Sequence, residues 1–208
     1  MLVSGGVDAN GNPLASAELY NPVTGEWSET GSTSEARVGF TATLLANGEV
    51  LVAGGWGVTN CVATAELYNP PQGNGRPGSM TQPRCYHSAT LLPNGEVLTA
   101  GGAGHYLETD TLASAELYNP STGTWQTTGS LNVSRANAAA VLDNGQVLVA
   151  GGSDGYSNGT YNLLASAELY NPSTGLWSLT ASMAKGTLPT TPVLLMNNDV
   201  LIANAAQF

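Results

Sequence analysis

The hydrophobic residues of this chain fall in short runs separated by turn-forming residues. Residues 88–92 (Ser-Ala-Thr-Leu-Leu) and 96–100 (Glu-Val-Leu-Thr-Ala) are two such runs, and Asn94-Gly95 stands between them. Asn-Gly between β-rich runs is a strong signal for a hairpin. No segment carries a helical period of useful length, so the pattern predicts an all-β structure.

Several motifs recur in one order along the chain. A Gly-Gly doublet follows an apolar run at residues 5–6, 54–55, 101–102 and 151–152. Ala-Glu-Leu-Tyr, followed at once by Asn-Pro, recurs at residues 17–20, 65–68, 115–118 and 167–170. Three copies then reach a tryptophan, at Trp27, Trp125 and Trp177, whereas the second copy has Gly75 in that position. A period of about 50 residues with four strand signals is typical of a propeller blade. The second blade should have the weakest outer strand.

These motifs resemble the kelch repeat, in which Gly-Gly follows the second strand, a tyrosine lies in the third and a tryptophan in the fourth. The resemblance covers essentially the whole chain. It implies a kelch-type β-propeller of four-stranded antiparallel blades, with about four blades present. We expect a single domain over residues 1–208, with repeats at about 1–33, 34–81, 82–132 and 133–183 and a partial repeat at 184–208.

The last, partial copy raises the question of how the ring closes. Asn198-Asp199 stands there in place of Asn-Gly, and Asn204-Ala205 in place of the Gly doublet. Residues 192–196 could supply a missing first strand beside residues 1–6 and so close four blades. We prefer the interpretation that the chain is cut from a larger propeller. A dimer in which two arcs close one ring is the alternative, because open end blades expose faces that expect a neighbour.

The charge of the chain excludes several classes of partner. Only 5 of the 208 residues are basic against 15 acidic ones, which gives a formal net charge of -10. Such a surface repels phosphate backbones and anionic lipid, so we expect no nucleic-acid partner and no membrane insertion. The uncharged polar composition resembles that of extracellular or cell-surface proteins. Cys61 and Cys85 have no metal-ligand spacing and could be free or paired.

Three of the five basic residues recur just before the first strand of successive blades: Arg37, Arg84 and Arg135. Repeat glutamates precede them by 18 or 19 residues, at Glu18, Glu66 and Glu116. A glutamate in mid-strand is partly buried between blades, and burying a carboxylate without a partner costs several kcal/mol. We therefore expect structural charge pairs between these arginines and repeat glutamates across blade boundaries. A ring of arginines that binds an acidic ligand is the functional alternative.

Binding should lie in the parts that do not repeat. In an up-and-down blade, the loops between strands two and three emerge on the same face as the connections between blades, and here they differ from blade to blade. They carry aromatic residues among neutral hydrogen-bonding ones: Trp56, His105, Tyr106, Tyr156 and Tyr161. Such loops suit a protein or carbohydrate partner, since rings stack while amides and hydroxyls recognise polar groups. We expect a non-catalytic binding or scaffold module without a cofactor; in the structural alternative, the aromatics only cover the strand ends.

Tyr86 and His87 complete the set of binding candidates and open a second possibility. Residues 84–88, ahead of residues 91–95, resemble the Tyr-His strand of galactose-oxidase-type radical copper enzymes, which are kelch propellers. By that match Tyr86 and His87 would ligate copper. The rest of that copper site has no matching motif here, and an incomplete ligand set does not hold or tune the metal. We expect no metal site and keep the propeller part of a secreted galactose or glyoxal oxidase-like enzyme as the alternative function.

Overall fold

The structure is a computed structural model that describes residues 1–69, 77–105, 110–136, 139–141, 145–188, 193–197 and 199–202. For residues 139–141 it describes the backbone alone. All regular elements in these ranges are β-strands, paired antiparallel, so the predicted all-β class is confirmed. No helix in this part of the chain could cross a membrane.

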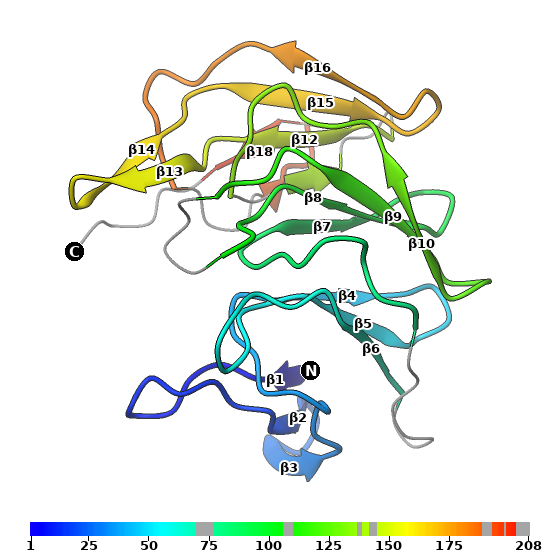
Figure 1. Ribbon diagram of the computed structural model, residues 1–208. Coiled ribbons are helices and arrows are strands. Elements are labelled where there is room, and N and C mark those ends of the chain that lie inside the picture. The colour runs from blue at the N-terminus through cyan, green and yellow to red at the C-terminus, as the bar shows by residue number, and fades with distance from the viewer. Residues whose placement is uncertain are drawn as a thin grey trace.

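The strands form a series of small sheets that follow one another along the chain (Figure 1). The first sheet holds β1 (Leu2–Ser4), β2 (Ala17–Asn21) and β3 (Glu26–Thr30). The second holds β4 (Thr41–Leu44), β5 (Val50–Ala53) and β6 (Ala65–Tyr68). The third holds β7 (Ser88–Leu91), β8 (Val97–Ala100), β9 (Ala115–Asn119) and β10 (Thr124–Thr128).

The fourth sheet holds β11 (Ala139–Val141), β12 (Val147–Ala150), β15 (Ala167–Asn171) and β16 (Leu176–Thr180). Between β12 and β15 the chain forms a separate hairpin of β13 (Ser153–Ser157) and β14 (Thr160–Leu163), which the sequence pattern did not predict. A last hairpin joins β17 (Val193–Leu194) to β18 (Val200–Leu201). Each sheet is a propeller blade or part of one.

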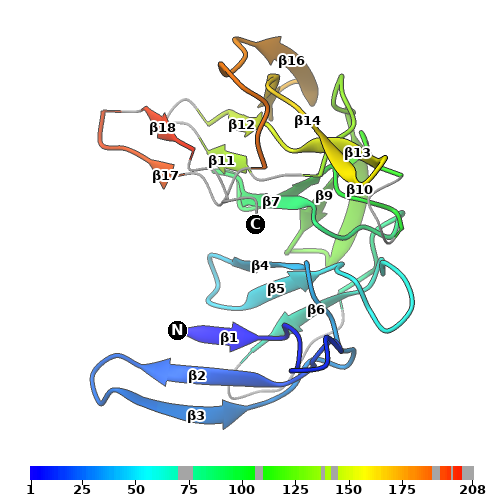
Figure 2. The same ribbon diagram turned by 90° about the vertical axis from the view of Figure 1, so that its left-hand side faces the viewer.

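The innermost strands of successive blades lie side by side, β4 against β7, β7 against β11 and β11 against β17. Figure 2 shows the blades fanning out from these strands in an open row, with the first sheet and the β17–β18 hairpin at its two ends. Within the described residues β17 pairs with β18, and β1 pairs with β2. The pairing of residues 192–196 with residues 1–6 that would close four blades is therefore not formed by β17.

The hydrophobic core lies between blades. One cluster joins Leu98 of the third blade to Val147, Tyr170 and Trp177 of the fourth. A second cluster joins Leu51 and Met80 to Val97 and Tyr118, across the boundary between the second and third blades. Because both faces of an inner blade are covered by neighbours, a strand such as β8 is buried along its whole length.

The Asn-Gly signals mark hairpins, but the turn differs from a two-residue Asn-Gly turn. Between β4 and β5, Gly48 N–H donates to Leu45 O at 3.0 Å and Leu45 N–H donates to Glu49 O at 2.8 Å. Gly48 has a φ of 87°, and Asn47 is not among the residues of positive φ. The side chain of Asn47 instead accepts a hydrogen bond from Glu49 N–H at 3.1 Å. Asparagine therefore serves here as a side-chain cap of the turn, and glycine alone supplies the left-handed residue.

The partial last copy keeps this cap one residue earlier than the sequence comparison placed it. Asn197 accepts a hydrogen bond from Asp199 N–H at 3.2 Å, and Leu195 N–H donates to Asp199 O at 2.8 Å. Asn197 thus takes the place of Asn47, and Asp199 takes that of Glu49. The expected weakness of the second blade's outer strand concerns Gly75, which lies outside the described residues, as do Asn204 and Ala205.

Candidate functional site

Buried ion pairs between arginine and glutamate join the blades. Arg37 lies 2.7 Å from Glu66, Arg84 lies 2.8 Å from Glu116, and Arg135 lies 3.1 Å from Glu168. All three arginines are 0% exposed, and their partner glutamates are buried as well. The second carboxylate oxygen is also bonded; that of Glu116 accepts from Thr81 N–H at 2.8 Å. Each carboxylate is therefore paired and hydrogen-bonded, as burial requires.

Each arginine bridges two blades through its own backbone. Arg84 N–H donates to Val62 O at 3.2 Å and Gly55 N–H donates to Arg84 O at 2.9 Å, which ties its main chain to the second blade. Its guanidinium group donates to Gly101 O at 2.8 Å and reaches Glu116, both in the third blade. Burial lowers the pKa of Arg84, and the hydrogen bond and charge of Glu116 oppose that shift. The guanidinium thereby fixes the third blade against the second.

The first glycine of each doublet permits this approach. Gly101 has a φ of 66°, and a Cβ on it would lie 2.2 Å from Arg135 O. Any other residue would collide with the connection that carries the next arginine. The doublet is therefore part of the blade boundary as well as the end of a strand.

The glutamate partners differ from those expected. Each arginine pairs with the glutamate that follows it, so Glu168 takes part, whereas Glu18 is exposed and forms none of the ion pairs in the described residues. Matching each arginine with the Ala-Glu-Leu-Tyr motif of its own repeat would have found Glu168. The position equivalent to the arginines in the fourth connection belongs to Thr187, since Gly152 N–H donates to Thr187 O at 2.8 Å. Lys185 lies two residues before it.

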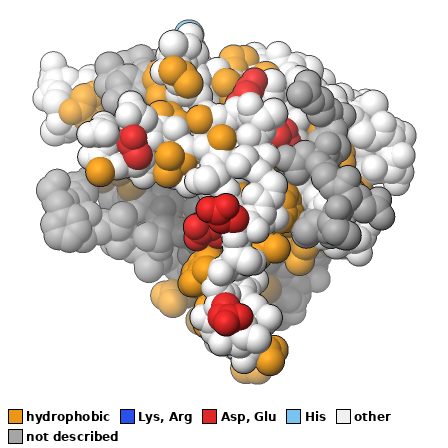
Figure 3. Space-filling view, turned by 90° about the horizontal axis from the view of Figure 1, so that it is seen from below, with side chains coloured by type: hydrophobic (Ala, Val, Ile, Leu, Met, Phe, Trp, Pro, Cys, Tyr) orange, Lys and Arg blue, Asp and Glu red, His pale blue; other side chains and the backbone are white. Residues whose placement is uncertain are grey.

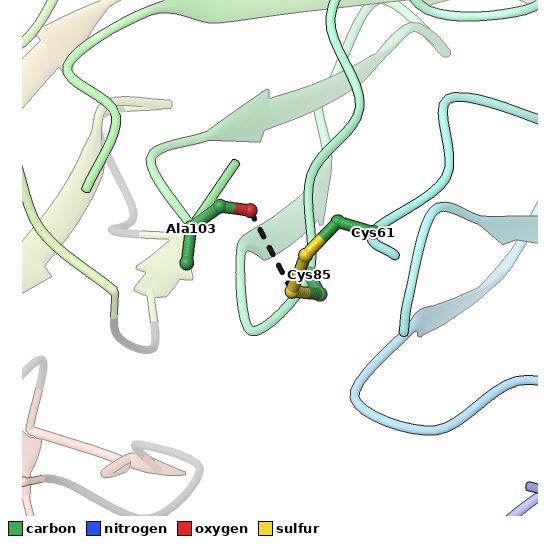
Figure 4. Close-up of a disulfide and its surroundings, with 3 residues drawn as sticks. All are labelled: Cys61, Cys85 and Ala103. Atoms are coloured by element: carbon green, nitrogen blue, oxygen red, sulfur yellow. Dashed lines mark hydrogen bonds between the residues drawn. A yellow bond between two sulfur atoms is a disulfide. The ribbon is translucent and has the colours of Figure 1, made fainter. Parts of the chain in front are cut away.

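The two cysteines are joined. A disulfide connects Cys61, in the loop after β5, to Cys85, in the connection before β7 (Figure 4). Cys85 Sγ lies 3.6 Å from Ala103 O, and Trp56 packs against the cluster formed by these three residues. The disulfide therefore ties a variable loop of the second blade to the boundary with the third. Disulfides persist in oxidising compartments.

Tyr86 occupies an unfavourable backbone conformation beside the disulfide. Its φ is 55°, and the equivalent residue one repeat earlier is Gly39, with a φ of 62°. A tyrosine in this region pays about 1 to 2 kcal/mol relative to ordinary backbone. The ring lies on Gly39, where a Cβ would come within 2.6 Å of it, and the side chain remains 39% exposed. Because an exposed side chain here is held in a sparsely populated backbone conformation, Tyr86 remains a candidate for binding.

The side chain of His87 points into the interior, unlike the exposed side chain of Tyr86. It is 5% exposed, its Nε2 lies 2.9 Å from Thr41 Oγ1, and its buried Nδ1 has no hydrogen-bond partner. Burial, and secondarily the charge of Arg84, lower the pKa of His87 to about 3. The imidazole is therefore neutral and fills the space that Phe40 fills in the second blade, where Phe40 lies against Gly5 and Gly55.

Some of the predicted loop aromatics are packed against neighbouring residues, and others are exposed. Trp56 is partly buried against the disulfide, and His105 is exposed. Tyr156 and Tyr161 face each other across the β13–β14 hairpin with ring centroids 4.9 Å apart in an edge-to-face arrangement, and Tyr161 is 39% exposed. Tyr106 lies outside the described residues. The structure thus brings two of the predicted residues into one aromatic pair, of which Tyr161 is exposed and Tyr156 is partly buried.

A family model described as the Kelch motif matches residues 1–33 and 134–184. The chain thus carries the Kelch motif in its first and fourth blades. Between the two matched stretches, the same doublets, tyrosines and arginine pairs recur in the second and third blades. No curated protein matches the chain at a significant level. Kelch repeats generally mediate protein interactions, so the match indicates a binding module in the broad sense.

The kelch enzymes with a radical copper centre provide a test for Tyr86 and His87. His87 Nε2 is already bonded to Thr41, its ring is buried, and the Tyr86 ring lies on Gly39. Among the residues that the structure describes, no group of three or more His, Cys, Asp and Glu side chains could hold a metal ion. The Nε2 atom of His87 and the Tyr86 ring are thus both engaged by groups of the protein.

Two shallow hollows lie at blade boundaries on the face opposite the variable loops. One, of about 480 Å³, is lined by turn residues 45–47, 94–96 and 119–121. The other, of about 690 Å³, is lined by residues 93–94, 145–146 and 171–173, one blade further on. Both are built from the repeat's own Asn-Gly and Asn-Pro turns. They belong to the repeated scaffold, and none of the predicted binding residues that the structure describes lines them.

Proposed function

We propose that this kelch-repeat protein is a non-catalytic binding module that presents the loops between strands two and three to a protein or carbohydrate partner. The observation that carries the proposal is the Tyr156–Tyr161 pair, with Tyr161 exposed, on a hairpin that projects from the repetitive frame. The hairpin replaces a simple loop in one blade alone among the four, within the described residues. A feature added to one blade of a repeat is not needed to build the blade.

The expected ligand surface is neutral and polar with apolar faces. The three arginines are fully buried in ion pairs, so they are not offered to an acidic ligand. Asp154 lies beside the aromatic pair and accepts a hydrogen bond from Asn162, which adds an acceptor to the hairpin. Tyrosine rings flanked by amide and carboxylate groups suit a sugar face or an extended peptide.

The proposal is tested by screening the chain against arrays of neutral glycans and of secreted proteins. We expect retained ligands to be lost by the variant Tyr156→Ala/Tyr161→Ala, because truncating a buried aromatic contact at an interface costs about 2 kcal/mol or more. The matched control is Val23→Ala/Leu176→Ala, which removes exposed apolar side chains, 91% and 65% accessible, away from the loop face. Binding that both double variants reduce equally would contradict the proposal.

A further inference from the structure

A motif for covalent modification lies at the tip of the β13–β14 hairpin. Asn158-Gly159-Thr160 has the form Asn-x-Thr, where x is not proline. This is the acceptor motif of N-linked glycosylation, in which a sugar chain is attached to the asparagine side chain. The repeat turns at residues 119–121 and 171–173 read Asn-Pro-Ser, and their proline excludes them as acceptors.

The turn presents the acceptor asparagine to solvent. Ser157 pairs with Thr160, so Asn158 and Gly159 form a two-residue turn, with φ values of 52° and 80°. Two left-handed residues are typical of the type I′ turn, for which Asn-Gly is preferred. Residues 157–162 are all exposed. Within the described residues the Asn158 side chain forms no hydrogen bond, so its amide nitrogen is available for modification.

The second acceptor motif of the chain is Asn132-Val133-Ser134, and its asparagine is engaged in the fold. Asn132 Nδ2 donates to Glu168 Oε2 at 2.8 Å, and its backbone N–H donates to the same oxygen. Asn132 is itself exposed, but its carboxylate partner is 0% exposed and paired with Arg135. A sugar on Asn132 Nδ2 would be attached at the nitrogen that bonds this buried ion pair.

The hairpin can open without disturbing a blade. Apart from one bridge from Ser153 to Ala136 at its base, β13 pairs with β14 alone within the described residues. A single two-stranded hairpin is marginally stable, so its tip can separate locally to enter the binding site of a transferase. The segment of Asn132 is held at the blade boundary instead, where Ser134 Oγ lies 2.9 Å from Thr111 Oγ1.

The disulfide between Cys61 and Cys85 is an independent observation that supports modification. Disulfides form in oxidising environments such as the lumen of the endoplasmic reticulum. N-linked sugar chains are transferred to asparagine in the same lumen. A chain that acquires this disulfide there meets the glycosyltransferase as well.

We propose that Asn158 carries an N-linked glycan and that Asn132 keeps its structural role. In the transfer, Nδ2 of Asn158 attacks the anomeric carbon of an oligosaccharide carried on a lipid diphosphate. The bond from Nδ2 to this carbon forms, and the bond from the carbon to the phosphate oxygen breaks. The lipid diphosphate leaves, and a base of the transferase accepts one amide proton. The proposal does not rest on binding by the loop face.

The test secretes the full chain, behind a cleavable leader, from a eukaryotic cell and measures glycan occupancy at each asparagine. Peptide N-glycosidase in heavy-oxygen water converts a glycosylated asparagine into labelled aspartate, which peptide mass spectrometry quantifies. Mass is preferred to gel mobility because acidic chains migrate anomalously: the net charge is -10, and Figure 3 shows acidic and no basic side chains on the face in view. We expect the label at Asn158 in most secreted molecules and at Asn132 in few.

Two substitutions of one exposed residue supply the matched controls. Thr160→Ala removes the motif and keeps Asn158-Gly159, so it should abolish the label at Asn158. Thr160→Ser keeps the motif and should retain the label. Ser134→Ala removes the second motif and should leave the occupancy of Asn158 unchanged.

Three results would overturn the proposal. One is a secreted wild-type chain without label at Asn158. Another is a label that persists in Thr160→Ala, since it would come from spontaneous deamidation of Asn-Gly. The third is an occupancy at Asn132 equal to or above that at Asn158. Loss of ligand binding by the loop face would leave all three measurements unchanged, so the two proposals fail separately.

Discussion

At the residue scale, each buried guanidinium group contacts three groups of the next blade: a glycine carbonyl, the residue just before a strand and a carboxylate. Arg84 donates to Gly101 O, Ser114 O and Glu116, all in the blade that follows. Both side chains of its ion pair are 0% exposed, so solvent does not screen the pair. Such a pair fixes one arrangement of two blades, because any displacement leaves a buried charge unpaired.

The ion pair predicts a large penalty for losing one partner. Arg84→Met and Glu116→Gln should each lower the free energy of unfolding by about 3 to 5 kcal/mol, while the double variant should lose much less than their sum. Urea unfolding of the four proteins gives the coupling. The control Glu18→Gln alters an exposed glutamate and should change stability by less than about 0.5 kcal/mol. Additive losses at the pair would contradict the assignment.

His87 predicts a pH dependence of known sign. Its pKa in the folded chain is about 3, below the 6.5 of an unperturbed histidine, so the unfolded chain binds the proton first. The stability that the neutral imidazole contributes is complete above pH 6.5 and declines as the pH falls toward 3. Between pH 7 and pH 5 the loss should be about 2 kcal/mol.

The matched variant for this prediction is His87→Phe, which places the residue of the second blade, Phe40, at the same position. It removes the titrating group and keeps the volume. Acidification should lower the unfolding free energy of the wild type more than that of His87→Phe, so the variant gains stability relative to the wild type. A difference that stays constant from pH 7 to pH 5 would show that His87 is accessible to protons when folded.

At the element scale, the outer strands differ in the hydroxyl that they offer the next blade. Tyr68 bonds to Thr30 and Tyr170 bonds to Thr128, both at the end of the preceding outer strand. Gly78 N–H donates to Gly123 O as Gly129 N–H donates to Gly175 O, so Pro77 stands where the threonine would be. Tyr118 Oη is accordingly buried without a partner, and Trp125 Nε1 is also buried without one.

This difference predicts opposite outcomes for one substitution at two equivalent sites. Tyr170→Phe should cost about 1 kcal/mol, since it removes a hydrogen bond and strands Thr128. Tyr118→Phe should be neutral or stabilising, because it removes a buried hydroxyl that has no partner. Urea midpoints of the two variants decide the matter, and an equal loss at both sites would show that Tyr118 is hydrogen-bonded.

Also at the element scale, the disulfide joins a loop to a connection 24 residues away. Closing a loop of this length should stabilise the fold by roughly 3 to 4 kcal/mol. A reductant should lower the unfolding free energy of the wild type by that amount and leave Cys61→Ala/Cys85→Ala unaffected. Identical unfolding curves with and without reductant would mean that the bond does not form.

At the scale of the whole molecule, the blades could be predicted because several motifs recur at one spacing. The sequence spacing pairs each arginine with the repeat glutamate before it, whereas the actual partner is the glutamate after it. Spacing alone does not tell which way the arginine side chain extends. Backbone bonds to Gly55 and Val62 decide that direction for Arg84. The left-handed conformation of Tyr86 and the β13–β14 hairpin have no sequence signal of comparable strength. For function, the sequence predicts only that binding residues lie in the loops that differ from blade to blade.

The described residues divide into a repeated scaffold and loops that differ from blade to blade. Charge pairs, glycine doublets and aromatic pairs repeat because they hold one blade to the next. Tyr86, Tyr156 and Tyr161 do not repeat, and they remain accessible on the connections and loops of one face. The chain is acidic and its described arginines are buried, which supports our proposal that this face binds neutral polar partners.

The most direct test is amide hydrogen exchange of the chain with and without a ligand retained on the arrays. We predict protection at the β13–β14 hairpin and around Tyr86, with no change at the turns of residues 45–48 and 171–175 on the opposite face. Protection confined to those turns, with the hairpin unchanged, would contradict binding by the loop face.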